Sequence, residues 1–155
     1  MRLFHAGITA ATLLLAVVGT SAQQKPNFSG TWVVVSPAES AGEETTIKHD
    51  ATTFTHGHAS EGGGHSFAYK LDGTETRITM PSHGDEIVIL AKASWDGDRL
   101  VIVEQVTYPD GRKADGTTIW SLAAQGQLVR EFVRKEEGKP PHTSKVISKK
   151  KVSDV

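Results

Sequence analysis

The chain has 155 residues, no cysteine, and 17 basic against 18 acidic residues, for a formal net charge of −1. This length suits one domain that can bury a core of its own. Without cysteine there is no disulfide scaffold, no thiolate metal site and no cysteine nucleophile. Without a basic excess, the chain is not typical of a general nucleic-acid binder.

The N-terminus has the three parts of a secretory signal peptide. Arg2 and His5 precede an uncharged run over residues 6–19, and small residues follow at 20–22. We predict a signal peptide over residues 1–22 and an exported domain, periplasmic or secreted, over residues 23–155. The alternative is a membrane anchor, but the apolar run is short for a bilayer span. We therefore expect no stable membrane span after cleavage, and a lipid anchor would need a cysteine.

The remaining sequence alternates short β-type runs with turn signals. Glycine adopts the positive φ of tight hairpins, so turns are expected at Asp72-Gly73, Asp96-Gly97, Asp110-Gly111, Asp115-Gly116, Gln125-Gly126 and Gly138. The expected strands are Gly30–Val35, Thr45–His49, Thr52–His58, His65–Leu71, Thr74–Met80, Glu86–Trp95, Arg99–Tyr108, Thr117–Leu122, Gln127–Lys135 and His142–Val152.

Short turns between successive runs predict an all-β antiparallel up-and-down meander of eight to ten strands. Such a meander has two unpaired edges, and closure into a lipocalin-like barrel removes them. Alternating apolar positions indicate the inward face, namely Phe67, Tyr69, Leu71, Ile87, Ile89, Ala91, Ala93, Trp95, Thr118, Trp120 and Leu122. In the runs over 99–108 and 127–135 both faces carry apolar residues, so their register stays open.

One helical signal interrupts the β pattern, at Ser36-Pro37-Ala38-Glu39. Serine suits the cap, proline suits the first helical position, and the glutamate completes a capping box. Only about one turn of 3.6 residues fits before the next expected strand.

The first expected strand opens with Phe28-Ser29-Gly30-Thr31-Trp32. This segment resembles the Gly-x-Trp opening of lipocalins and fatty-acid-binding proteins, the calycin group, whose tryptophan plugs the closed end of the barrel. Together with Lys70–Gly73 and Trp95–Val101, it also resembles short exported bacterial proteins. The resemblance covers most of residues 27–152 and implies a calycin-type barrel with Trp32 at its base.

Two departures from the calycins bear on the interior. Fatty-acid-binding proteins insert a helix-turn-helix lid after the first strand, and only residues 36–44 are available for one here. Lipocalins often carry a disulfide, which this chain lacks, and place an arginine over the tryptophan, a role open to Arg130 or Arg134. We expect a barrel without a lid, either hollow or filled by its own side chains.

Three histidines, His56, His58 and His65, fall close together in the sequence. The first two share a strand face, and a hairpin around residues 60–64 would bring His65 beside His58. Three imidazoles suit zinc or copper. The other interpretation is a set of solvated polar residues at a loop rim.

Arg130 and Arg134 share one face of their expected strand with Phe132. The resemblance to fatty-acid-binding proteins implies that an inward arginine near the C-terminus holds a ligand carboxylate, here with Tyr108. The alternative is that the intervening valines face inward and the arginines are solvated.

These observations predict a monomeric protein that binds a small apolar or amphipathic molecule, with no cofactor and no nucleic-acid partner. The candidate lining residues are Phe67, Tyr69, Ile87, Ile89, Trp95, Tyr108, Trp120, Arg130, Phe132 and Arg134. The alternatives are a filled barrel that presents its outer surface to a partner, and a histidine-based metal binder. We expect no enzyme, because there is no Gly-x-Ser-x-Gly motif and the adjacent His49 and Asp50 point to opposite strand faces.

Overall fold

The computed structural model describes residues 24–58 and 64–152, so the predicted signal peptide lies outside the described residues. The strands are β1 (Gly30–Ser36), β2 (Glu44–His49), β3 (Thr53–His58), β4 (His65–Lys70), β5 (Thr76–Ser82), β6 (Asp85–Asp96), β7 (Arg99–Thr107), β8 (Lys113–Leu122), β9 (Leu128–Glu136) and β10 (His142–Lys150). Two short 3-10 helices, η1 (Ala38–Ser40) and η2 (Ala124–Gly126), follow β1 and β8. In this part of the chain no helix is long and apolar enough to cross a membrane.

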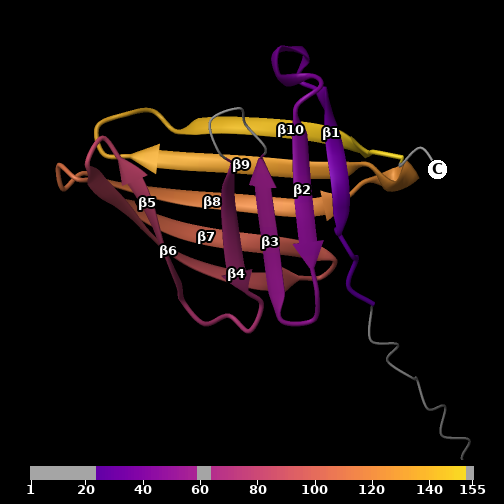
Figure 1. Ribbon diagram of the computed structural model, residues 1–155, viewed down its shortest axis with the longest axis horizontal. Helices are drawn as coiled ribbons and strands as arrows, with labels where there is room; N and C mark the ends of the chain where they lie inside the picture. The colour runs from indigo at the N-terminus through magenta and orange to yellow at the C-terminus, as the bar shows by residue number, and fades with distance from the viewer. Residues whose placement is uncertain (1–23, 59–63, 153–155) are drawn as a thin grey trace, which may run out of the picture.

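All ten strands belong to one antiparallel sheet in the order β4-β3-β2-β1-β10-β9-β8-β7-β6-β5. Strands β1 to β4 cross in front of β6 to β9, so that the two halves of the sheet face each other (Figure 1). This confirms the predicted all-β meander, as a nearly closed barrel. Closure occurs between β1 and β10, and the two edges of the sheet, β4 and β5, form no ladder with each other. The expectation that closure removes both edges is therefore wrong at this point.

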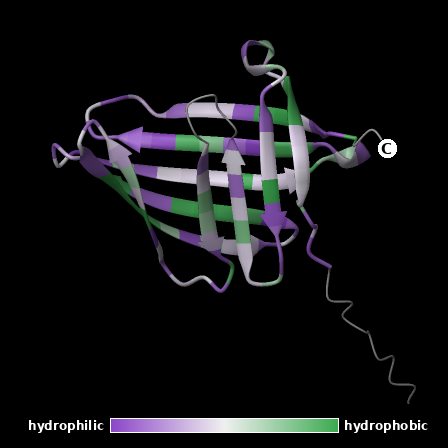
Figure 2. Ribbon diagram, in the orientation of Figure 1, coloured by the Kyte–Doolittle hydropathy of each residue, from purple (hydrophilic) through white to green (hydrophobic). Residues whose placement is uncertain are grey.

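The alternation of side chains along each strand decides what faces the interior. On β6, Ala91 and Ala93 are buried and Lys92 between them is exposed, and hydrophobic and hydrophilic bands succeed each other along the strands of the back half (Figure 2). The register of β9 is now settled, because Arg130 lies directly opposite the buried Trp120 of β8. Since directly opposed residues share a face, the arginine face of β9 is the inward one.

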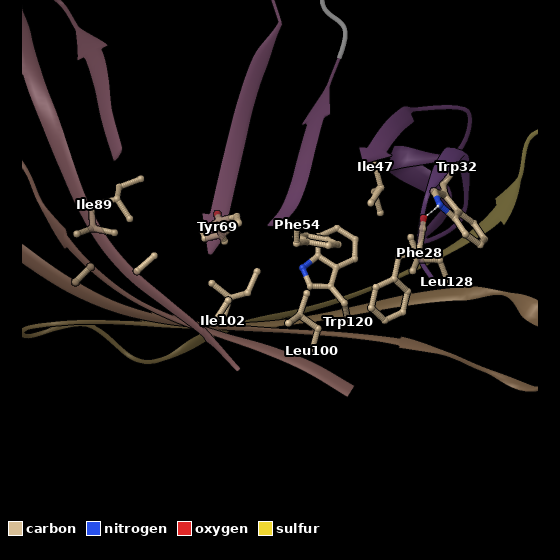
Figure 3. Packing of buried hydrophobic residues seen from close by; sticks show 14 residues of the cluster. Phe28, Trp32, Ile47, Phe54, Tyr69, Ile89, Leu100, Ile102, Trp120 and Leu128 are labelled. Carbon is tan, nitrogen blue, oxygen red and sulfur yellow. Dashed lines mark hydrogen bonds between the residues drawn. The ribbon is translucent and has the colours of Figure 1, made fainter. Parts of the chain in front are cut away.

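Aromatic side chains fill one end of the barrel (Figure 3). Trp32 is 2% exposed, and its Nε1 donates a hydrogen bond to the carbonyl oxygen of Phe28 at 2.8 Å. The Phe28 ring stacks on those of His49 and Trp95, with centroids 5.6 and 5.9 Å away. The Gly-x-Trp opening thus contributes the aromatic base that the calycin resemblance implied.

Two local predictions are wrong. Asp115-Gly116 forms no turn, because both residues lie within β8 and pair with β7 and β9 on either side. Ser36 caps no helix: it ends β1, and η1 begins after Pro37 with no side-chain cap hydrogen bond. The other predicted turns have the expected positive φ, at Gly73, Gly97, Gly111, Gly126 and Gly138. The segment between β1 and β2 holds only η1, which is too short for a helix-turn-helix lid.

We expect Trp32→Ala to lower the free energy of unfolding by about 3–5 kcal/mol, because it removes a buried indole and leaves a cavity at the base. Urea denaturation followed by far-UV circular dichroism measures this. Val103→Ala, on a side chain that is 52% exposed, is the control and should change the value by at most about 0.5 kcal/mol. A similar small change in Trp32→Ala would contradict the role of the base.

Candidate ligand-binding cavity

The barrel contains a cavity of about 410 Å³ next to the aromatic base, and this cavity is partly open to solvent. This volume is within the range of small-molecule sites, roughly 300–1,000 Å³. The interior is therefore hollow rather than filled by the protein's own side chains. Residues from β3 through β10 line it, namely His56, His58, Phe67, Tyr69, Met80, Ile87, Ile89, Glu104, Val106, Tyr108, Thr118, Trp120, Arg130, Phe132, Arg134 and Ser144.

The predicted lining residues lie on this wall with one exception. Trp95 does not line the cavity, because β6 carries it to the aromatic base beside Phe28. The sequence reasoning missed Glu104 of β7, where apolar residues on both faces left the register open. Ile102 and Val106 lie two residues before and after Glu104, and both are buried. Their period of two is the signal that would have predicted an inward Glu104.

Arg130 is an inward guanidinium without an acidic partner among residues 24–58 and 64–152. Its Cζ lies 5.6 Å from the centroid of the Trp120 ring, and it takes part in none of the ion pairs formed there. Burial lowers the pKa of Arg130, and the charge of Glu43 partly offsets this. Arginine still keeps its proton under ordinary conditions, so the cavity wall carries a cation that forms no ion pair with a carboxylate of this part of the protein.

Arg134, the other predicted candidate, has a different environment. Its Cζ lies 5.6 Å from the Tyr108 ring centroid, and its Nε lies 3.8 Å from Oε1 of Glu136. The Tyr108 hydroxyl donates a hydrogen bond to the same Oε1 at 3.4 Å. Arg134 therefore has a carboxylate partner, which makes Arg130 the stronger candidate for a ligand anion.

Two histidines lie on the wall of the cavity near Arg130. The His56 ring stacks on those of Phe67 and Tyr69, with centroids 5.3 and 5.8 Å away. Burial, with smaller contributions from the charges of Arg130 and His58, lowers the pKa of His56 to about 3. His58 shares a hydrogen bond with Thr45, Nδ1 to Oγ1 at 3.1 Å, and burial also lowers its pKa. Both imidazoles are therefore neutral at pH 7.

The three-histidine metal site is not formed. His58 pairs with His65 across β3 and β4, but His65 is exposed and does not line the cavity. His56 is held in an aromatic stack. Within the described ranges, no group of three or more histidine, aspartate or glutamate side chains is placed to hold a metal ion.

A second polar pair lies on the cavity wall four residues along β8 from the position of Arg130. The hydroxyl of Tyr69 on β4 donates a hydrogen bond to Oε1 of Glu104 on β7 at 2.8 Å. Burial raises the pKa of Glu104, while this hydrogen bond and the charge of Arg134 act in the opposite direction. The bond joins an edge strand of the sheet to the opposite wall.

Comparison with known proteins agrees with this fold. No protein-family model matches the chain, and no curated protein has a matching sequence. Among solved structures, one described as "REP1-NXSQ fatty acid transporter" is similar with a TM-score of 0.56 and 14% sequence identity, over 81% of this chain and 97% of that chain. At this identity the likeness concerns the fold alone, a nearly closed antiparallel β-barrel.

We expect acidification to destabilise the protein through His56. The unfolded chain binds a proton at this residue below about pH 6.5, whereas the folded chain does so only near pH 3. Between these values the unfolded state binds more protons, so the free energy of unfolding falls by up to about 1.4 kcal/mol per pH unit. Urea denaturation at pH 7, 6 and 5 should show a shallower fall in His56→Gln than in the wild type. The exposed His65→Gln is the control, and equal slopes in all three proteins would contradict a buried neutral His56.

Proposed function

We propose that the protein is an exported carrier that binds a small amphipathic acid inside its barrel. The observation that carries the proposal is a hollow, largely apolar cavity whose wall includes Arg130, a guanidinium with no carboxylate partner in the described residues. Apolar walls supply affinity, and a few polar groups fix the orientation of a ligand. An anionic head would form charge-assisted hydrogen bonds with Arg130 and compensate its charge.

The charges on the cavity wall favour a ligand with a single negative charge. The lining residues include two guanidinium groups, Arg130 and Arg134, and one carboxylate, Glu104. The neighbouring histidines are neutral, and Arg134 is paired with Glu136, so Arg130 is the lining cation that forms no ion pair in the described residues. A monoanionic acid with an apolar body would compensate the charge of Arg130 and cover the apolar wall.

The similar solved structure supports this ligand class through its fold, since its description names a fatty acid transporter. Export is supported by the composition of residues 1–22. The proposal contains no catalytic step, because a carrier needs only the cavity and its charged groups.

Native mass spectrometry tests export and loading together. When the full chain is expressed in a bacterial host and purified gently, we expect the mass of residues 23–155 plus a ligand on the order of a few hundred daltons, the size class that such cavities hold. Denaturation should release the ligand and leave the bare chain. Retention of the signal segment would contradict export. A bare chain that also fails to bind added fatty acids would contradict the carrier function.

We expect Arg130→Gln to weaken binding of dodecanoic acid by about 10- to 100-fold, because a hydrogen bond to a charged group contributes about 1.5–3 kcal/mol. Isothermal titration calorimetry measures this, and the methyl ester, which lacks the charge, should bind both proteins alike. Arg99→Gln makes the same change at an exposed arginine paired with Asp96 and should leave the affinity unchanged. Equal affinity of wild type and Arg130→Gln for the acid would contradict the role of Arg130.

A further inference from the structure

The cavity contains a second polar site that the proposed function does not use. Glu104 of β7, Gly116 of β8 and Arg134 of β9 lie in one row across three paired strands, since Gly116 is directly opposite both of the others. All three are on the inward face, and both charged residues line the cavity. The central position of this row has no side chain.

The carboxylate of Glu104 lies beside Gly116 of β8. A Cβ at this position would be 3.4 Å from Oε2 of Glu104 and 3.7 Å from Cε2 of Phe132, so a longer side chain would occupy the same space. Glycine within a strand weakens it, and a close approach of another group is a common reason for its presence. The two charged groups are thereby brought to opposite sides of a bare stretch of backbone.

Glu104 and Arg134 are near enough for the charge of Arg134 to lower the pKa of Glu104, but they form no direct ion pair or hydrogen bond. Tyr69 donates a hydrogen bond to Oε1 of Glu104, and Oε2 accepts none within the described part of the chain. Nε of Arg134 is buried and has no hydrogen-bond partner there either. The row therefore offers an acceptor on one side and a cationic donor on the other.

A hydroxyl group matches this arrangement because it both donates and accepts. It can donate to Oε2 of Glu104 and accept from the guanidinium of Arg134. An ammonium group only donates and would be repelled by Arg134, whereas a carbonyl only accepts and would face the carboxylate of Glu104. A neutral hydroxyl also adds no second charge to that of the acidic head.

The register separates this site from Arg130. Arg130 is opposite Trp120, and Gly116 lies four residues earlier on β8, which corresponds to about 13 Å of strand at roughly 3.3 Å per residue. A series of contacts runs from one site to the other along the wall: Tyr69, which bonds to Glu104, stacks on His56, and the His56 ring lies 5.2 Å from that of Trp120. A ligand held at both sites carries its hydroxyl well away from its acidic head.

We propose that the Glu104–Gly116–Arg134 row, with Tyr69, binds a hydroxyl group in the distal half of the ligand, so that the carrier selects hydroxylated amphipathic acids over unsubstituted ones. This rests on the proposed function, because it assumes that an acid occupies the barrel with its head at Arg130. The hydroxyl site determines which acids bind tightly, while Arg130 determines that an acid binds at all.

The test compares the affinities of three kinds of probe of equal chain length by calorimetry. They are dodecanoic acid, its derivative hydroxylated next to the carboxylate, and its derivatives hydroxylated in the distal half of the chain. We expect the wild type to bind at least one distal hydroxy acid about 10-fold or more tightly than the other two, as a hydrogen bond to a charged group allows. Glu104→Gln should reduce this preference, taken as the ratio of the affinities for the distal hydroxy acid and for dodecanoic acid in the same variant, to about 3-fold or less. Glu131→Gln, the same change on the outer face of β9 next to Lys145, should retain the full preference.

The outcomes separate this proposal from the proposed function. Equal affinity of the wild type for all three probes, with Arg130→Gln still weakening every one, overturns the hydroxyl site and leaves the carrier function intact. A preference that survives in Glu104→Gln also overturns it. If no probe binds the wild type, both proposals fail. Urea denaturation of Glu104→Gln distinguishes a purely structural role, which would lower stability and weaken all probes equally.

Discussion

The register of β8 against β7 and β9 is the constraint on which the interior depends. It places Leu100, Trp120 and Arg130 in one inward row and Glu104, Gly116 and Arg134 in another. A slip by one residue would turn each of these side chains to the outer face. The charged groups of the cavity are thus fixed by backbone pairing over three long strands, and their positions do not depend on the loops.

The barrel has two parts that differ in their packing: an aromatic base whose side chains are closely packed, and a cavity whose wall carries polar groups. At the base, Phe28, His49 and Trp95 pack ring against ring, and the indole of Trp32 satisfies its only donor internally. Beyond it, polar groups remain incompletely paired in the residues that the structure describes, including Arg130 and Nε1 of Trp120. A buried polar group without a hydrogen-bond partner lowers the free energy of unfolding. The packing of the aromatic base offsets this loss of stability.

Much of the fold could be predicted from the sequence because the signals for it are local. Alternation and Asp-Gly turns indicated the strands and their order. The error at Asp115-Gly116 has a physical cause. The same Asp-Gly dipeptide forms turns at three other places in the chain, and only the pairing with the long strands β7 and β9 shows that β8 continues through this one. Three other features depend on contacts between distant segments and could not be predicted in this way. They are the closure between β1 and β10, the opening between β4 and β5, and the different environments of Arg130 and Arg134. Glu104 was missed for a different reason, because apolar residues on both faces of β7 obscured the period of two through Ile102 and Val106.

The unpaired edges of β4 and β5 make the mechanical properties of the wall uneven. Elsewhere around the barrel, widening would break a ladder of backbone hydrogen bonds. Between these two edges the backbone amide of Lys70 donates a hydrogen bond to Oγ1 of Thr76 at 3.2 Å, and Tyr69 of β4 bonds to Glu104 of β7 on the opposite wall at 2.8 Å. Deformation is least costly there, so the compliance of the barrel is concentrated along one line.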